Sequence, residues 1–168
     1  MPVSHLSRLF YSKWLLLSLL IIFIAAGAFL VEGRHPYAYY LSFYIGQTGE
    51  MIYQMDVKPG DTMLLNYIHS VDGTPISARF EIRDEVLHLI EESYSWYGSG
   101  LESGAGYQFA FREDQVIVSG YERIFEELPL RVARTVPQEI MIEDKGEVVS
   151  LQQLAPGGTL LIIRVNKK

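Results

Sequence analysis

The 168-residue sequence predicts a single all-β domain, an antiparallel β-sandwich or a barrel-like fold, preceded by one N-terminal transmembrane helix. Two observations predict this arrangement. Residues 14–31 form an apolar run without a charge, whereas the chain after residue 38 alternates apolar and polar residues in short segments. A continuous apolar run of this length is typical of a membrane span, and alternation with period 2 is typical of strands with one buried face.

The apolar run, WLLLSLLIIFIAAGAFLV, has eighteen residues, close to the length that crosses the hydrocarbon layer as a helix at about 1.5 Å per residue. Arg8 and Lys13 precede it, and only Arg34 follows closely. The positive-inside rule therefore predicts that residues 1–13 are cytoplasmic and that the bulk of the protein lies outside the cytoplasmic membrane.

A cleaved signal peptide is the alternative to a membrane anchor, because Ala26-Gly27-Ala28 fits the small-x-small cleavage pattern. The anchor is favoured because the apolar run continues through residues 29–31 and so reaches spanning length. Both alternatives deliver the same β domain, residues 39–168, to the same side of the membrane, after a linker at residues 32–38.

Within the β domain, segments of alternating or apolar character are separated by Gly, Pro, Asp and Asn at intervals of about ten residues, as in sandwiches and barrels. The clearest is ISARFEIR, which puts four apolar residues on one face and four polar residues on the other. The predicted strands are 39–45, 51–57, 62–69, 76–83, 86–94, 107–111, 115–119, 130–134, 138–142, 148–152 and 159–165. A short turn near residues 121–127 is the one candidate for helical structure.

The segment NYIHSVDGTP places His69 beside Ser70, ahead of Asp72-Gly73, which favours a two-residue type I′ turn. This turn predicts that His69 pairs with Ile76 and Tyr67 with Ala78 across a hairpin. Because strand residues alternate, Ser70 then points away from His69 and cannot be activated by it. His69 is expected to pack at the edge of the core, with ligand contact as the second interpretation.

The most glycine-dense segment is GSGLESGAGY, at residues 98–107. It fits neither the dinucleotide-binding nor the P-loop pattern, because the third glycine, the following helix and the Gly-Lys-Ser/Thr are missing. We expect a surface loop, with contact to a ligand or partner as the second interpretation. The candidate contact residues in and around it are Trp96, Tyr97, Gly98, Gly100 and Glu102.

Composition excludes several classes of function. The sequence has no cysteine, so disulfides, thiolate metal sites and thiol nucleophiles are excluded. The chain from Glu32 onward carries a net charge of about −8 and no cluster of Lys or Arg, so we expect no nucleic-acid binding.

The remaining ionisable residues suggest no catalytic or metal centre. The histidines form no HxH or HxxxH pair, so neither a metal nor a cofactor is expected; His69, His88, Asp72 and Glu102 are the nearest approach to a ligand set. The adjacent carboxylates at 91–92 and 126–127 indicate solvated edges.

One basic residue completes the candidate binding site. Arg131 could hold an anion in a pocket with His69 and the glycine-rich loop, and the other candidate contact residues beside His69 are Ser70 and Asp72.

The segments YIHSVDGTPI at 67–76 and YSWYGSGL at 94–101 resemble the bacterial and archaeal family known as domain of unknown function 1850. The resemblance covers roughly residues 53–134, and its most specific parts are HSV-x-x-TP and YG-x-GL. Ala78 stands where the family usually has an acidic residue, and Glu102 where proline is usual. The family transfers no catalytic residues.

The resemblance implies an association with TRAP transporters of the TAXI type, because members are commonly encoded beside such permeases. We therefore expect a non-enzymatic, membrane-tethered accessory protein that contacts the transporter permease or its substrate-binding protein. The alternative is a small-molecule binding domain with a pocket near His69 and the glycine-rich loop. An enzymatic site assembled from distant strands stays open as a third possibility.

Overall fold

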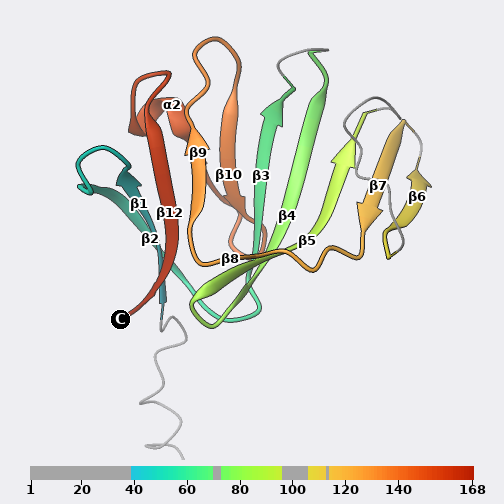
Figure 1. The fold of residues 1–168 in the computed structure, drawn as a ribbon, viewed down its shortest axis with the longest axis horizontal. Coiled ribbons are helices and arrows are strands. Elements are labelled where there is room, and N and C mark those ends of the chain that lie inside the picture. The colour runs from blue at the N-terminus through green and yellow to red at the C-terminus, as the bar shows by residue number, and fades with distance from the viewer. Residues whose placement is uncertain (1–38, 70–72, 96–105, 113) are drawn as a thin grey trace, which may run out of the picture. The chain divides into compact units, whose positions relative to one another are not determined.

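The computed structural model describes residues 39–69, 73–95, 106–112 and 114–168, which all belong to one compact unit, Tyr37–Lys168. This unit is all-β, and the strands pair antiparallel in two sheets (Figure 1). The predicted membrane segment, 14–31, lies outside the described residues. Within the described ranges, no helix is long and apolar enough to cross a membrane.

The smaller sheet has four strands in the order β2-β1-β12-β9. Its strands are β1 (Tyr39–Ile45), β2 (Met51–Val57), β9 (Leu128–Arg131) and β12 (Leu160–Lys167). The first and last strands of the domain pair along their length, from Tyr39 opposite Lys167 to Ile45 opposite Leu161. This pairing ties the two ends of the domain together.

The larger sheet runs in the order β11-β10-β3-β4-β5-β7-β6, and a short strand, β8, also pairs with β5. Its strands are β3 (Thr62–Ile68), β4 (Pro75–Arg83), β5 (Val86–Tyr94), β6 (Gln108–Arg112), β7 (Gln115–Ser119), β8 (Ile124–Phe125), β10 (Gln138–Ile142) and β11 (Glu147–Ser150). Figure 1 shows the chain running from β7 through β8 to β9 along the lower edge of this sheet.

Both sheets contribute to one hydrophobic core. Alternation puts Leu161, Ile163 and Val165 of β12 on the buried face of the smaller sheet, and every second residue of β4 on the buried face of the larger one. The completely buried apolar side chains include Leu41, Phe43, Val57, Met63, Ile82, Val118, Ile140, Ile142, Leu151, Leu161 and Ile163. The all-β prediction is confirmed.

The β3–β4 hairpin differs from its predicted register by two residues. Tyr67 lies opposite Ile76 and Leu65 opposite Ala78, so the predicted pairings of Tyr67 with Ala78 and of His69 with Ile76 are wrong. The His69 N–H donates to Thr74 O at 2.8 Å, so four residues connect the strands instead of two. A shift of two residues leaves every side chain on its predicted face, because the strand period is also two.

Two further segments depart from the predicted strands. The segment predicted as a strand at 148–152 leaves the sheet at Ser150 and makes one helical turn, α2 (Leu151–Leu154), which buries Leu151 completely. The Gln152 amide holds this turn by donating to Val136 O at 2.5 Å. Around 121–127 the chain pairs with β5 as β8 where a turn was predicted.

Candidate functional site

Of the candidate site residues predicted from the sequence, His69 and Arg131 belong to the described part of the chain. The other candidates lie outside the described residues: Ser70, Asp72, Trp96, Tyr97, Gly98, Gly100 and Glu102. Their proposed contacts with a ligand or partner stay predictions.

Neither His69 nor Arg131 lines the cavity to which their neighbours in the sequence contribute. His69 is half-buried at the end of β3, two residues beyond Tyr67, which does line the cavity. Arg131 donates to Gly158 O at 2.7 Å and so holds the turn before β12, while its neighbour Leu130 lines the cavity.

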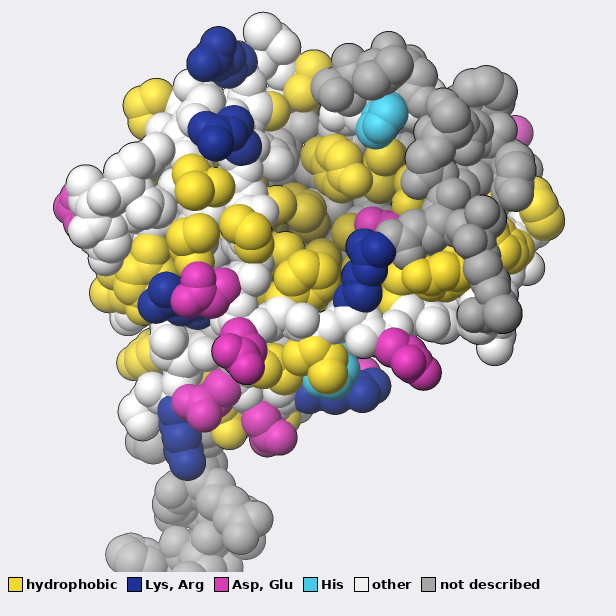
Figure 2. Space-filling view, in the orientation of Figure 1, with side chains coloured by type: hydrophobic (Ala, Val, Ile, Leu, Met, Phe, Trp, Pro, Cys, Tyr) yellow, Lys and Arg dark blue, Asp and Glu magenta, His cyan; other side chains and the backbone are white. Residues whose placement is uncertain are grey.

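This cavity, here called the inner pocket, has a volume of about 210 Å³ and lies between the buried face of the larger sheet and the segment from β8 to β9. Figure 2 shows hydrophobic side chains gathered over the middle of one face of the domain. The residues that line the inner pocket are Leu65, Tyr67, Ala78, Phe80, Leu89, Glu92, Arg123, Phe125, Leu128, Leu130 and Gln138. Most of its wall is therefore apolar, and its polar groups are few.

A β-bulge brings one carboxylate into this apolar pocket. Phe80 lies opposite Leu89, but the next residue back on β4, Arg79, lies opposite Glu91, so Ile90 has no partner of its own. The extra residue shifts the alternation of β5 by one position. Glu92 therefore lies opposite Ala78 on the inner face, where a regular strand would have turned it outward.

Two tyrosine hydroxyls hold this carboxylate. Tyr94 and Tyr121 each donate a hydrogen bond to Glu92 Oε2, both at 2.7 Å. The ring of Tyr121 in turn packs on that of Tyr107, with ring centroids 5.2 Å apart. Short O–H···O⁻ bonds of this kind fix the orientation of the carboxylate.

The same environment raises the pKa of three tyrosines. Burial raises the pKa of Tyr94 and Tyr121, and the hydrogen bonds and negative charge of Glu92 raise it further. The pKa of Tyr67 is also raised, by burial and then by the charge of Glu92. These hydroxyls therefore keep their protons at neutral pH, and those of Tyr94 and Tyr121 act as hydrogen-bond donors. No group of three or more potential metal ligands gathers in the described residues.

Several polar groups of the inner pocket make no hydrogen bond to the described residues. Both tyrosines bind Oε2 of Glu92. Among the described residues, no group donates to Oε1, and the Tyr67 hydroxyl makes no hydrogen bond. Gln138 accepts from the Ala133 N–H at 2.9 Å through Oε1, and its Nε2 makes no hydrogen bond to those residues. The pocket thus offers a ligand the charged acceptor Glu92, the Tyr67 hydroxyl, which can donate or accept, and the amide donor of Gln138.

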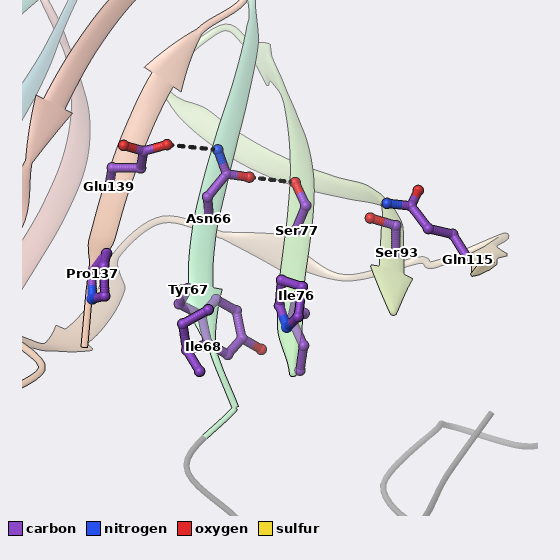
Figure 3. Close-up of a pocket in the computed structure, with 10 residues that line it drawn as sticks. Asn66, Tyr67, Ile68, Ile76, Ser77, Ser93, Gln115, Pro137 and Glu139 are labelled. Atoms are coloured by element: carbon purple, nitrogen blue, oxygen red, sulfur yellow. Dashed lines mark hydrogen bonds between the residues drawn. The ribbon is translucent and has the colours of Figure 1, made fainter. Parts of the chain in front are cut away.

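A second hollow, on the outer face of the larger sheet, has a volume of about 340 Å³. Figure 3 shows Glu139, Asn66 and Ser77 in a row across β10, β3 and β4. Ser77 donates to Asn66 Oδ1 at 2.7 Å, and Asn66 donates to Glu139 at 3.3 Å. Because these side chains satisfy one another across the sheet, this hollow is the weaker candidate for a ligand site.

Sequence reasoning missed Glu92, because the pair at 91–92 indicated a solvated edge. Glu91 agrees with that interpretation, since its side chain is 32% exposed and lies within 4.0 Å of Arg79. Glu92 contradicts it, because the bulge turns Glu92 inward. The available signal was the phase of Tyr94, an aromatic residue that lies two positions from Glu92 and shares a strand face with it.

Comparison with known proteins identifies the family of the chain. Residues 63–148, just over half of the 168-residue sequence, match the family described as domain of unknown function (DUF1850). The match includes the β3–β4 hairpin and the residues of the inner pocket. No curated protein and no solved structure matches the chain. The chain therefore belongs to the DUF1850 family, as the hairpin and glycine-rich motifs predicted.

Proposed function

We propose that the β domain is a binding module that holds a small organic molecule in the inner pocket. One observation carries this proposal: a cavity of about 210 Å³ with apolar walls contains a fixed carboxylate and polar groups that the described protein residues leave without partners. Ligand sites typically combine a mostly apolar wall with a few polar groups that set orientation.

The chemistry of the tyrosines supports binding over catalysis. A hydroxyl with a raised pKa is a poor base and a poor nucleophile near neutral pH, because both roles require the proton to leave. Tyr94 and Tyr121 instead hold Glu92 in one orientation. A site that is already arranged in this way loses less entropy when a ligand binds.

Filling the cavity is expected to abolish binding. Ala78 lines the inner pocket and is only 3% exposed, so Ala78→Leu places an isobutyl group in the space a ligand would occupy. In a fragment screen by thermal shift, a ligand at about 100 times its Kd is expected to stabilise the wild-type chain by about 2.7 kcal/mol. The Ala78→Leu variant is expected to fold and to lose this stabilisation.

The control for this change is Ala110→Leu, on the fully exposed strand β6. It should leave ligand stabilisation unchanged. Fragments that stabilise Ala78→Leu as much as the wild type would place their site elsewhere. A full set of small amines, acids and alcohols without any effect on the wild-type chain would remove the proposed function.

A second role, contact with a transporter, is favoured by β6, the last strand of the larger sheet among the described residues. All five residues of β6 are exposed, and Phe111 is 71% exposed. An exposed edge strand is a template for pairing with another protein. We propose that residues 14–31 anchor the β domain to the cytoplasmic membrane and that this domain is a sandwich-like module on its outer side. We further propose that β6 contacts the permease or the binding protein of a TAXI-type TRAP transporter.

A photo-crosslinking residue at position 111 tests this contact in native membranes. It is expected to capture a transporter component, whereas the same residue at Val148, 53% exposed on β11, is not. Protease added to intact spheroplasts before illumination should abolish the adduct, because the β domain is outside. This second role would be contradicted by equal capture from both positions or by no capture from either. It would also be contradicted by an adduct that survives the protease while an exported control protein is digested.

A further inference from the structure

The polar end of the inner pocket contains one carboxylate, Glu92, as its charged acceptor. A carboxylate that receives two O–H···O bonds on Oε2 still has the full acceptor capacity of Oε1. The groups that donate to Oε2, Tyr94 and Tyr121, are neutral hydroxyls, so they orient the carboxylate without cancelling its charge. A ligand that binds Glu92 must therefore supply a hydrogen-bond donor, and a positively charged donor makes the strongest such bond.

The walls of the pocket suit an apolar body with a cationic end. Phe80 and Phe125 meet edge to face inside the lining, with ring centroids 5.8 Å apart, and Tyr67 adds a third ring. Aromatic rings attract cations through their faces. The volume of about 210 Å³ lies below the roughly 300–1,000 Å³ of pockets for drug-sized ligands, so the body must be small.

The charge of the whole domain acts in the same direction. Residues 39–168 contain 11 Lys and Arg against 19 Asp and Glu, a net charge of −8. Such a field raises the local concentration of cations and lowers that of anions. Arg123, which also lines the pocket, acts in the opposite direction, so an acid of the same shape is the informative competitor.

We infer that the inner pocket selects a small apolar primary amine, whose ammonium group donates to Glu92 Oε1 and to the Tyr67 hydroxyl while its hydrocarbon body fills the apolar end. This ligand class rests on the proposed binding function. It names what the pocket holds, and it makes Glu92 the specificity-determining residue.

Three compounds with one hydrocarbon body test the inference by calorimetry on the full chain in lipid nanodiscs, where no detergent competes for the pocket. These are 3-methylbutylamine, leucine and 4-methylpentanoic acid. The amine is expected to bind most tightly, leucine more weakly and the acid not measurably. Methylamine, which lacks the apolar body, is expected not to bind. The inference is overturned if the acid or leucine binds as tightly as the amine, or if methylamine does.

Glu92→Gln is expected to weaken binding of 3-methylbutylamine by about 10- to 100-fold, because it removes the charged acceptor and keeps the shape. The matched control is Glu91→Gln, one residue away on the outer face, which should bind the amine like the wild type. If Glu92→Gln does not fold, Tyr67→Phe serves instead, with an expected loss of about 3- to 10-fold. Unchanged affinity in the folded variant overturns the inference.

The two proposals fail in different ways. If neutral fragments or acids bind and Ala78→Leu blocks them, the binding function stands and the amine class falls. If the amine binds equally to the wild type and to Ala78→Leu, it binds at the surface through the net charge of the domain. The inference about the amine class and the assignment of its site to the inner pocket are then both rejected. If no compound of any class binds, the proposed function itself falls.

Discussion

The β domain is expected to lose stability steeply as the pH rises above about 10, because the pKa values of Tyr67, Tyr94 and Tyr121 are raised in the folded state. An unfolded tyrosine releases its proton near pH 10, whereas these folded tyrosines keep theirs. Between those two values the unfolded state binds fewer protons than the folded state, so each tyrosine lowers the free energy of unfolding by about 1.4 kcal/mol per pH unit.

The sign of this effect follows from the direction of the shift. The contribution of these tyrosines to stability is complete below about pH 10 and is lost as the pH rises toward their folded pKa values. Tyr94 and Tyr121 both contribute to this loss above pH 10, and a typical domain has a total stability of only about 5–15 kcal/mol. Urea denaturation followed by circular dichroism from pH 8 to 12 measures the loss.

Other groups also titrate at high pH, so the test is a comparison of the pH dependence of unfolding between the wild type and variants. A Tyr94→Phe/Tyr121→Phe double variant is expected to lose stability much less steeply above pH 10 than the wild type. Tyr53→Phe is the matched control, since Tyr53 packs on Phe43 outside this cluster. An equally steep decline in the double variant and the wild type would show that the tyrosine cluster does not govern alkaline stability.

The alternation of the sequence predicted the strands well where one face is buried and the other is not. In β4, Ile76, Ala78, Phe80 and Ile82 are buried, and the polar residues between them are more exposed, as the pattern indicated. In such a strand the sequence shows which residues face the core, because every second residue lies on the same face. The strand prediction for residues 148–152 was wrong at its end, because the apolar residues of this segment also suit the helical turn that buries Leu151.

The hairpin register shows the limit of local turn chemistry. Asp72-Gly73 favoured a two-residue turn, but Gly73, with a φ of +69°, instead donates its N–H to His69 O at 3.0 Å to close a longer connection. Both registers put the same apolar residues on the same face, so burial could not distinguish them. The choice depends on pairing with β5 and β10, which a single sequence does not specify.

The candidate site was beyond sequence reasoning because it depends on one bulge and on residues far apart in the chain. Glu92 faces inward only because Ile90 is unpaired, and its partner Tyr121 comes from a segment with no strand pattern. In the family that the sequence resembles, an acidic residue is usual at the position that Ala78 occupies here. In this chain the inward carboxylate stands directly opposite Ala78, on the neighbouring strand.

Phe43→Ala is expected to destabilise the domain by about 3–5 kcal/mol and to lower Tm by roughly 10–20 °C. The Phe43 side chain is 0% exposed, and β1 lies between β2 and β12 in the smaller sheet. Its ring meets Tyr53 edge to face at 5.6 Å, so truncation removes apolar burial and an aromatic contact and leaves a cavity.

Phe111→Ala is the matched control, because it removes the same ring from a position that is 71% exposed, and it should change the free energy of unfolding by no more than about 0.5 kcal/mol. Comparable losses in the two variants would contradict a core built from both sheets. Phe43 does not line the inner pocket. The folded fraction of Phe43→Ala should therefore bind 3-methylbutylamine with wild-type affinity, which separates the stability of the scaffold from the selectivity that Glu92 is proposed to provide.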